Sequence, residues 1–170
     1  VLVKVPDMVS YSLVMLSGKA VISPAHLVGR RIATLGIPSV GAARLNAIFP
    51  NPSRQPITME IDSVEQGMQM LLDGKVQAAI LPTPFVNQRK AQGADVRVVL
   101  LTEPIPNLAL STGPNLAADA REVLRKALLE ADKSDAGRVM LRAMGMEKFE
   151  PATAAIYTGQ SRILAEYWGY

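Results

Sequence analysis

The sequence has 170 residues, a usual length for one domain that two small lobes could share. With 49% hydrophobic and 19% charged residues and no block of like charge, its composition is that of a globular protein and excludes a disordered or fibrous one. The 18 Lys and Arg against 15 Asp and Glu leave a net charge of only +3, too small for a nucleic-acid footprint.

Rare residue types and missing motifs exclude several kinds of site. The sequence has no cysteine and one histidine, His26, which excludes a disulfide scaffold and a thiol nucleophile and disfavours zinc. It has no Ser-His-Asp set, Walker loop or GxGxxG motif. No apolar run reaches the roughly 18 residues of a membrane span. We therefore expect no catalytic residue, no metal, no cofactor and no membrane span, and we expect His26 at the surface.

The first part of the chain contains two strand-like segments, 1–5 and 10–16. No initiator methionine, signal peptide or polar tail comes before the first of them, which suggests a fragment that starts inside a fold. We expect residues 1–23 to be hinge-side strands of a first lobe, part of which is missing from the chain.

Short apolar runs then alternate with helical periods over residues 31–101. The predicted strands are 31–35, 57–61, 77–81 and 96–101. The predicted helices are 39–49, 63–74 with a Ser63/Gln66 capping box, and 85–92. This alternation predicts an α/β lobe over residues 24–103, with a mainly parallel sheet and helices on both faces.

The last third of the chain has a different pattern. The segment TEPIPNLAL holds two prolines and an extended stretch, which predicts a crossing segment between lobes. Helices are predicted after it, over 116–128, 134–144 and 159–168. Because these helices need a surface to bury against, we assign residues 104–170 to the crossing segment and C-terminal helices of the partly missing first lobe.

Three corners between a strand and a helix are predicted at one edge of the parallel sheet, where ligands bind in open α/β folds. The first is GIPSVGAAR, in which Ser39 starts a helix and Val40 and Gly41 follow. Free N–H groups, a hydroxyl and the helix dipole suit a phosphonate, sulfonate, carboxylate or phosphate there. Ser63 and Thr83 mark the second and third corners, and we predict all five residues as ligand contacts.

Each corner also has a plain structural interpretation. Serine is a favoured helix cap anywhere, so Ser39 and Ser63 could be caps alone. Thr83 lies between two prolines in a turn that could simply start a helix. The convergence of the three corners at one edge, more than any single residue, indicates a small anionic ligand.

Three segments carry a resemblance to a known family. They are HLVGRRIATLGIPSVGAARL, EQGMQMLLDGKVQAAILPTPF, and NLALSTGPNLAADAREVLRKALLEADKSDAGRVMLRAMGMEKFEPATAAIY. In order and spacing they resemble the type II periplasmic solute-binding proteins, in the phosphonate/sulfonate-binding branch. The resemblance implies a periplasmic-binding-protein-like fold, a periplasmic location, an ABC permease as partner, and two lobes that close around the ligand.

The resemblance also implies roles for individual positions. In that branch the acid group of the ligand is held at the helix start that matches residues 39–41. A histidine commonly follows the serine that matches Ser63, where this chain has Val64. An acidic residue commonly lies in the loop that matches 82–84, where this chain has Thr83. These departures remove the groups expected to hold an aminophosphonate.

We interpret the chain as an extracytoplasmic solute-binding protein that captures a small oxyanion-bearing ligand for an ABC transporter. The alternative is a ligand-sensing domain of a receptor or transcription regulator with the same fold. An upstream helix-turn-helix would favour the regulator, and a signal peptide would favour the binding protein. An enzyme on this fold is disfavoured because no acid–base or nucleophilic set is visible.

Overall fold

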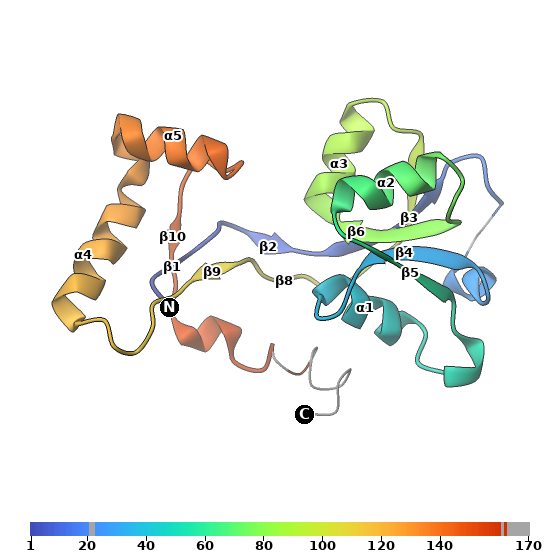
Figure 1. The fold of residues 1–170 in the computed structure, drawn as a ribbon, viewed down its shortest axis with the longest axis horizontal. Coiled ribbons are helices and arrows are strands. Elements are labelled where there is room, and N and C mark those ends of the chain that lie inside the picture. Colours follow the sequence, from blue (N-terminus) through green and yellow to red (C-terminus); the bar gives the residue numbers. More distant parts are fainter. Residues whose placement is uncertain (21–22, 161, 163–170) are drawn as a thin grey trace. The chain divides into compact units, whose positions relative to one another are not determined.

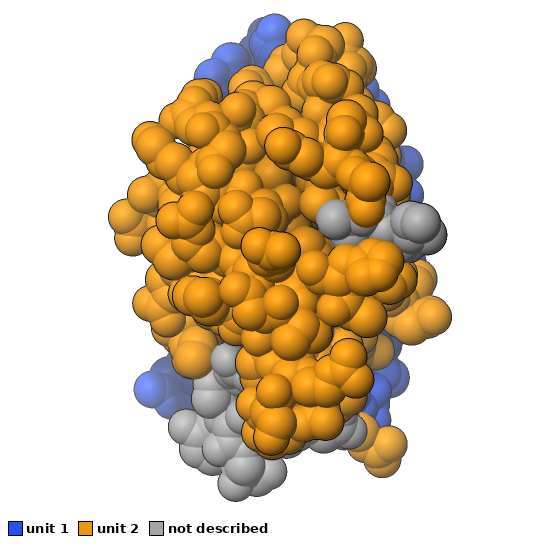
Figure 2. Space-filling view, turned by 90° about the vertical axis from the view of Figure 1, so that its right-hand side faces the viewer, with its two compact units in different colours: residues 1–8, 105–159 blue, residues 9–104, 160–170 orange. Residues whose placement is uncertain are grey.

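The computed structural model describes residues 1–20, 23–160 and 162. The chain divides into two compact units, which we call unit 1 (residues 1–8 and 105–159) and unit 2 (residues 9–104 and 160–170) (Figure 2). The main part of unit 2 is thus inserted between two parts of unit 1 in the sequence. No helix in the described part of the chain is long and apolar enough to span a bilayer.

Unit 2 is built on a five-stranded sheet (Figure 1). Its strands are β3 (Tyr11–Leu16), β4 (Arg31–Leu35), β5 (Ile57–Ile61), β6 (Ala78–Pro82) and β7 (Val96–Leu101), in the order β5-β4-β6-β3-β7. Strand β4 runs parallel to β5 and β6, whereas β3 is antiparallel to β6 and β7. Four strands therefore share one direction, which confirms the mainly parallel sheet.

Strand β3 is the main difference from the sequence expectation. The sequence pattern places segment 10–16 in the first lobe, whereas β3 lies inside the sheet of unit 2, between β6 and β7. Its central residues Leu13 and Val14 have no exposed surface, so the strand is buried on both faces. A buried strand that joins a sheet from a distant part of the sequence leaves no local pattern that identifies its neighbours.

Helices cover both faces of this sheet, as predicted (Figure 1). On one face α2 (Val64–Leu72) and α3 (Thr83–Ala91) pack through Met68, Leu71 and Val86. On the other face α1 (Val40–Ile48) and the short turn η1 (Pro24–Leu27) pack through side chains that include Leu45 and Leu27. A second short turn, η2 (Pro52–Arg54), leads from α1 to β5.

The ends of α2 follow from its sequence. The Ser63 hydroxyl accepts a hydrogen bond from the N–H of Gln66 at 3.1 Å. The Gln66 side chain reaches back to the N–H of Asp62 at 2.8 Å, one residue before the donor expected in a capping box. Gly74, at φ +70°, takes the left-handed conformation that ends the helix.

Unit 1 is smaller and is organised around a short central strand. Strand β1 (Val3–Lys4) pairs antiparallel with β9 (Ala109–Leu110) and β10 (Glu150–Pro151). Its helices are α4 (Ala118–Leu129), η3 (Ala131–Lys133), α5 (Asp135–Ala143) and η4 (Ala154–Tyr157). Strands β2 (Met8–Val9) and β8 (Ile105–Pro106) pair where the chain leaves and re-enters this unit. The predicted helices 116–128 and 134–144 are present, and the third, 159–168, lies mostly outside the described residues.

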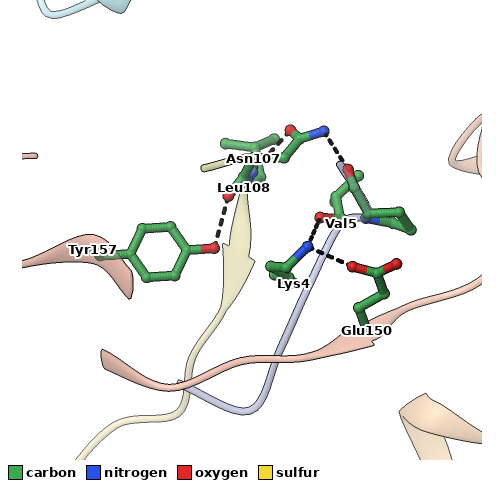
Figure 3. Close-up of polar contacts among 7 residues, drawn as sticks. Lys4, Val5, Asn107, Leu108, Glu150 and Tyr157 are labelled. Carbon is green, nitrogen blue, oxygen red and sulfur yellow. Dashed lines mark hydrogen bonds and ion pairs between the residues drawn. The ribbon is translucent and has the colours of Figure 1, made fainter. Parts of the chain in front are cut away.

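Hydrogen bonds and an ion pair link the extended segments of unit 1 to one another (Figure 3). The Lys4 amine lies 2.6 Å from the Glu150 carboxylate and bridges β1 to β10. The Tyr157 hydroxyl donates to the carbonyl of Asn107 at 2.7 Å, and the Asn107 amide donates to the carbonyl of Pro6 at 3.1 Å. These bonds join residues up to 146 positions apart in the sequence.

Candidate functional site

The sheet of unit 2 contains a point where the connections of two neighbouring strands leave in opposite directions. Strand β4 connects through α1 to β5 on one side, while its neighbour β6 connects through α3 to β7 on the other side. In open α/β sheets the crevice outside the carboxyl ends of such strands is the usual ligand site. The N-termini of α1 and α3 flank this switch point.

Ser39 caps α1 at the switch point. Its hydroxyl accepts the N–H of Ala42 at 3.1 Å and donates to the carbonyl of Leu35 at 2.9 Å. The hydroxyl proton is therefore already in use, and Ser39 must give up the Leu35 bond before it can donate to a ligand. The structural role of Ser39 is thus established, whereas its contact with a ligand remains a prediction.

The N–H groups of Val40 and Gly41 are the free donors of this corner. As the first two residues of α1 they have no partner within the helix, and no described residue accepts from them. Together with the positive end of the helix dipole they form an anion-binding surface.

Gly41 lets α1 lie close to the sheet. A Cβ atom at this position would be 3.0 Å from Thr34 Oγ1, 3.6 Å from Tyr11 Cε1 and 3.8 Å from the carbonyl oxygen of Ile80. The first turn of α1 is therefore in contact with β4, β3 and β6 together. A methyl group here would be in tight contact with Thr34 Oγ1, so either that side chain or the start of α1 would have to shift slightly.

Thr83 contributes a cluster of three hydroxyls on the other side of the switch point. Its Oγ1 accepts from Ser10 Oγ at 3.0 Å and lies 2.9 Å from Ser12 Oγ. Two hydrogen bonds use two of the three hydroxyl protons, so one proton has no acceptor among the described residues. Ser12 is fully buried, whereas Ser10 and Thr83 are half-buried.

Ser63 lies apart from the other predicted residues. It starts α2 after β5, the edge strand, so β4 separates it from β6. Strand spacing of about 4.8 Å puts the ends of β5 and β6 roughly 10 Å apart. The Ser63 hydroxyl accepts from Gln66 but has no acceptor for its own proton among the described residues. The structure thus brings residues 39–41 and Thr83 to the switch point and leaves Ser63 at its margin.

The sequence interpretation missed several residues at this edge. Ser10, Tyr11 and Ser12 come from β3, whose place in the sheet had no local signal. Burial raises the pKa of the half-buried Tyr11 hydroxyl, so this group stays protonated at neutral pH. Arg44, one turn after Val40 on α1, donates through Nη2 to the carbonyl of Glu103 at 2.9 Å. Its buried Nε atom has no partner among the described residues.

The groups at this edge are suited to binding an anion. They are backbone N–H groups, hydroxyls and one guanidinium. Within residues 1–20, 23–160 and 162, no group of three or more His, Asp or Glu side chains is arranged to hold a metal ion.

The amino-acid sequence matches a family model described as "ABC transporter, phosphonate, periplasmic substrate-binding protein" over residues 18–157. A comparison with curated proteins found no match. The family is that of a substrate-binding component of ABC transporters, which partners a permease and binds small ligands outside the cytoplasm. This description disfavours both an enzyme and the sensor alternative.

Similar solved structures share the fold at low sequence identity. PhnD1 from Prochlorococcus marinus, in complex with methylphosphonate, has a TM-score of 0.82 and 12% identity, covering 98% of this chain and 70% of its own. XAC2383 from Xanthomonas citri, bound to ATP, has a TM-score of 0.74 and 13% identity, with coverage of 96% and 69%.

A binding protein component of an ABC phosphonate transporter from Pseudomonas aeruginosa has a TM-score of 0.71 and 11% identity, with coverage of 96% and 60%. Their fold is the periplasmic-binding-protein-like fold that the sequence predicted. From the match over residues 18–157, the chain belongs to the family of periplasmic phosphonate-binding proteins of ABC transporters.

Proposed function

We propose that this solute-binding protein captures a small phosphonate or a related oxyanion at the switch point of unit 2. The N–H groups of Val40 and Gly41 hold the acid group, and the hydroxyl cluster around Thr83 supplies a further donor. Ser39 exchanges its bond to Leu35 for one to the ligand, and Ser63 makes an outer contact. The permease then receives the bound anion.

The observation that carries this proposal is the pair of free N–H groups at the start of α1, beside the switch point. A phosphonate oxygen accepts such bonds without needing a charged side chain, because the helix dipole already favours negative charge. The methylphosphonate bound to the similar PhnD1 supports a ligand of this class.

Arg44 adds a positive charge close to this surface. Residues four positions apart lie on the same face of a helix, so Arg44 is one turn beyond Val40. Its guanidinium is anchored by the Glu103 carbonyl, which holds the side chain at this edge of the sheet. We expect it to contribute to affinity through its charge even where it does not touch the ligand.

Val40→Pro tests the proposal because it deletes one N–H while leaving the helix intact. Proline is favoured at the first helical position, and Ser39 already has the extended conformation (φ −143°, ψ 150°) that proline requires of its predecessor. Loss of one charge-assisted hydrogen bond should weaken methylphosphonate binding by about 2 kcal/mol, a factor of about thirty in Kd.

The control is Asp135→Pro, which also deletes the N–H at the first position of a helix, α5 of unit 1, after an extended Ser134 (φ −110°, ψ 151°), and in addition removes the Asp135–Arg138 ion pair. Titration calorimetry with methylphosphonate, 2-aminoethylphosphonate, methanesulfonate and sulfate identifies the preferred anion, and denaturant melts confirm folding. Equal affinity of Val40→Pro and wild type for that anion would contradict the proposed site.

A further inference from the structure

A pocket of about 560 Å³ lies in unit 2, away from the switch point. Its lining includes three buried apolar side chains, Met15, Leu27 and Val76, and three exposed basic ones, Lys19, His26 and Arg30. A volume of this size falls within the range of about 300 to 1,000 Å³ that is typical of small-molecule sites.

The pocket lies at the opposite edge of the sheet from the free N–H groups of α1. Arg30 comes immediately before β4, whereas Ser39 follows the other end of that strand. Leu16, which also lines the pocket, is the last residue of β3, whose direction is opposite to that of β4 and β6. The end of β3 therefore lies at the same edge of the sheet as the start of β4. Five residues of strand separate the two edges by about 16 Å, too far for one small ligand to span both.

Two of the basic side chains of the rim, Lys19 and Arg30, have no anionic partner in the part of the chain that the structure describes. Among the described residues, neither the Lys19 amine nor the Arg30 guanidinium makes a hydrogen bond or an ion pair, and none of the residues that line the pocket is a carboxylate. Arg97 donates to the carbonyl of Lys19 at 2.7 Å and so holds this part of the rim. Positive charge at the entrance to an apolar pocket raises the local concentration of anions.

We propose that this pocket is a second binding site, for a small organic anion that carries a phosphate, phosphonate or carboxylate on an aromatic or branched apolar group. The apolar group lies on Met15, Leu27 and Val76, and the acid group meets Lys19 and Arg30. The site is separate from that of the transported solute, so its ligand binds while the switch point is occupied.

The probe is phenyl phosphate, titrated by calorimetry with the preferred switch-point anion present at saturation. Inorganic phosphate and phenol carry the two halves of the probe, and each should bind at least about tenfold more weakly than phenyl phosphate. Lys19→Glu and Arg30→Glu each replace an attraction with a repulsion and should weaken binding by about tenfold or more. Ala20 also lines the pocket, so Ala20→Phe should occupy part of its volume. This variant should weaken phenyl phosphate binding without changing the charge of the protein.

Two variants serve as controls. Lys90→Glu makes the same charge change at an exposed position of α3 that does not line the pocket. Val40→Pro alters the switch point alone. Both should retain phenyl phosphate affinity within about threefold, since neither touches the pocket. Denaturant melts check that each variant is folded.

Three results would overturn the proposal. The first is that phenyl phosphate does not bind the wild type at millimolar concentration. The second is that Lys90→Glu loses as much phenyl phosphate affinity as Lys19→Glu and Arg30→Glu. The third is that Val40→Pro no longer binds phenyl phosphate. The last result would place the probe at the switch point. The first would leave the proposed function intact, because methylphosphonate binding is measured separately.

Discussion

The two units of this chain differ in how completely they bury their apolar side chains. In unit 2 both faces of the sheet are covered, and a separate hydrophobic core lies on each face, one under α2 and α3 and the other under α1. Unit 1 has a core of five buried residues, Leu2, Val3, Ala131, Leu141 and Phe149. It leaves Val123 69% exposed on α4 and Val139 62% exposed on α5.

This difference shows what an amphipathic pattern can and cannot predict. The apolar stripe of residues 116–128 correctly predicted a helix, yet Val123 and Leu124 in the middle of the stripe are exposed. Periodicity identifies which face of a helix is apolar, but it does not identify the surface that covers it. Unit 2 contains its own covering layers, so we expect it to hold most of the stability measured for this chain.

The largest expected effect is on the core of unit 2. Leu71 on α2 has no exposed surface, so Leu71→Ala should lower the free energy of unfolding by about 3 kcal/mol through lost burial and a new cavity. Ile57→Ala, at a 54% exposed position of β5, is the control and should cost less than about 1 kcal/mol. Urea melts measure both, and similar losses would show that burial of Leu71 under α2 does not contribute to the stability of unit 2 as expected.

A second substitution tests unit 1 in the same way. The first turn of α5 passes so close to η3 that a Cβ atom at Gly137 would overlap the carbonyl group of Ala131. Because backbone must move to accommodate a methyl group, Gly137→Ala should cost about 2 kcal/mol of unit 1 stability. At Gly113 an added Cβ meets nothing within 4 Å, so Gly113→Ala is the control.

Hydrogen exchange distinguishes the units in this test. Gly137→Ala should speed amide exchange in α5 and leave α2 unchanged, because the units have separate cores. Faster exchange in α2 by the same factor would show that the two units unfold together.

A smaller effect is expected from the ion pair that joins β1 to β10. The hydrogen bond from Lys4 lowers the pKa of the Glu150 carboxyl, so the ionised form is favoured in the folded state. The pair therefore stabilises the folded state fully at pH values above the ordinary glutamate pKa, near 4.5. This stabilisation is lost as the pH falls through the lowered pKa that Glu150 has in the folded state.

Glu150→Gln removes that contribution. The gap in stability between wild type and Glu150→Gln should be wider at about pH 7 than at about pH 3. Glu122→Gln, which breaks the Glu122–Arg125 pair within α4, is the control. A gap that stays constant across this range would show that Lys4 and Glu150 do not stabilise unit 1 through their charges.

The smallest effect is expected on the exposed stripe. Val123→Ala should change the free energy of unfolding by less than about 0.5 kcal/mol, since the side chain is already mostly in contact with water. Denaturant melts at two protein concentrations measure this change. A loss above about 2 kcal/mol would show that the stripe is covered in solution.

Much of unit 2 could be predicted from its sequence because local signals determine its elements. The caps Ser39 and Ser63 begin helices at the expected positions, and the strands 31–35, 57–61 and 96–101 have the predicted bounds. The strand predicted at 77–81 lies one residue later, and the helix predicted from residue 85 begins at Thr83.

The candidate site could be predicted only in part. Helix starts are visible in sequence, so residues 39–41 and Thr83 were found. The hydroxyl cluster joins Thr83 to Ser10 and Ser12 across 73 and 71 positions, and no local pattern indicates such a pairing. The hydrogen bond from the Ser39 hydroxyl to the Leu35 carbonyl could not be predicted either, because it depends on the conformation of the turn between β4 and α1.

The central place of β3 also affects the order in which the chain folds. Its residues are synthesised before both of its neighbours in the sheet, β6 and β7, which end at residues 82 and 101. Until those strands are synthesised, β3 is an apolar segment with both backbone edges unpaired, the type of segment that misassociates most readily. Such pairing between distant positions slows folding, so the sheet of unit 2 cannot be completed before β7 has been synthesised.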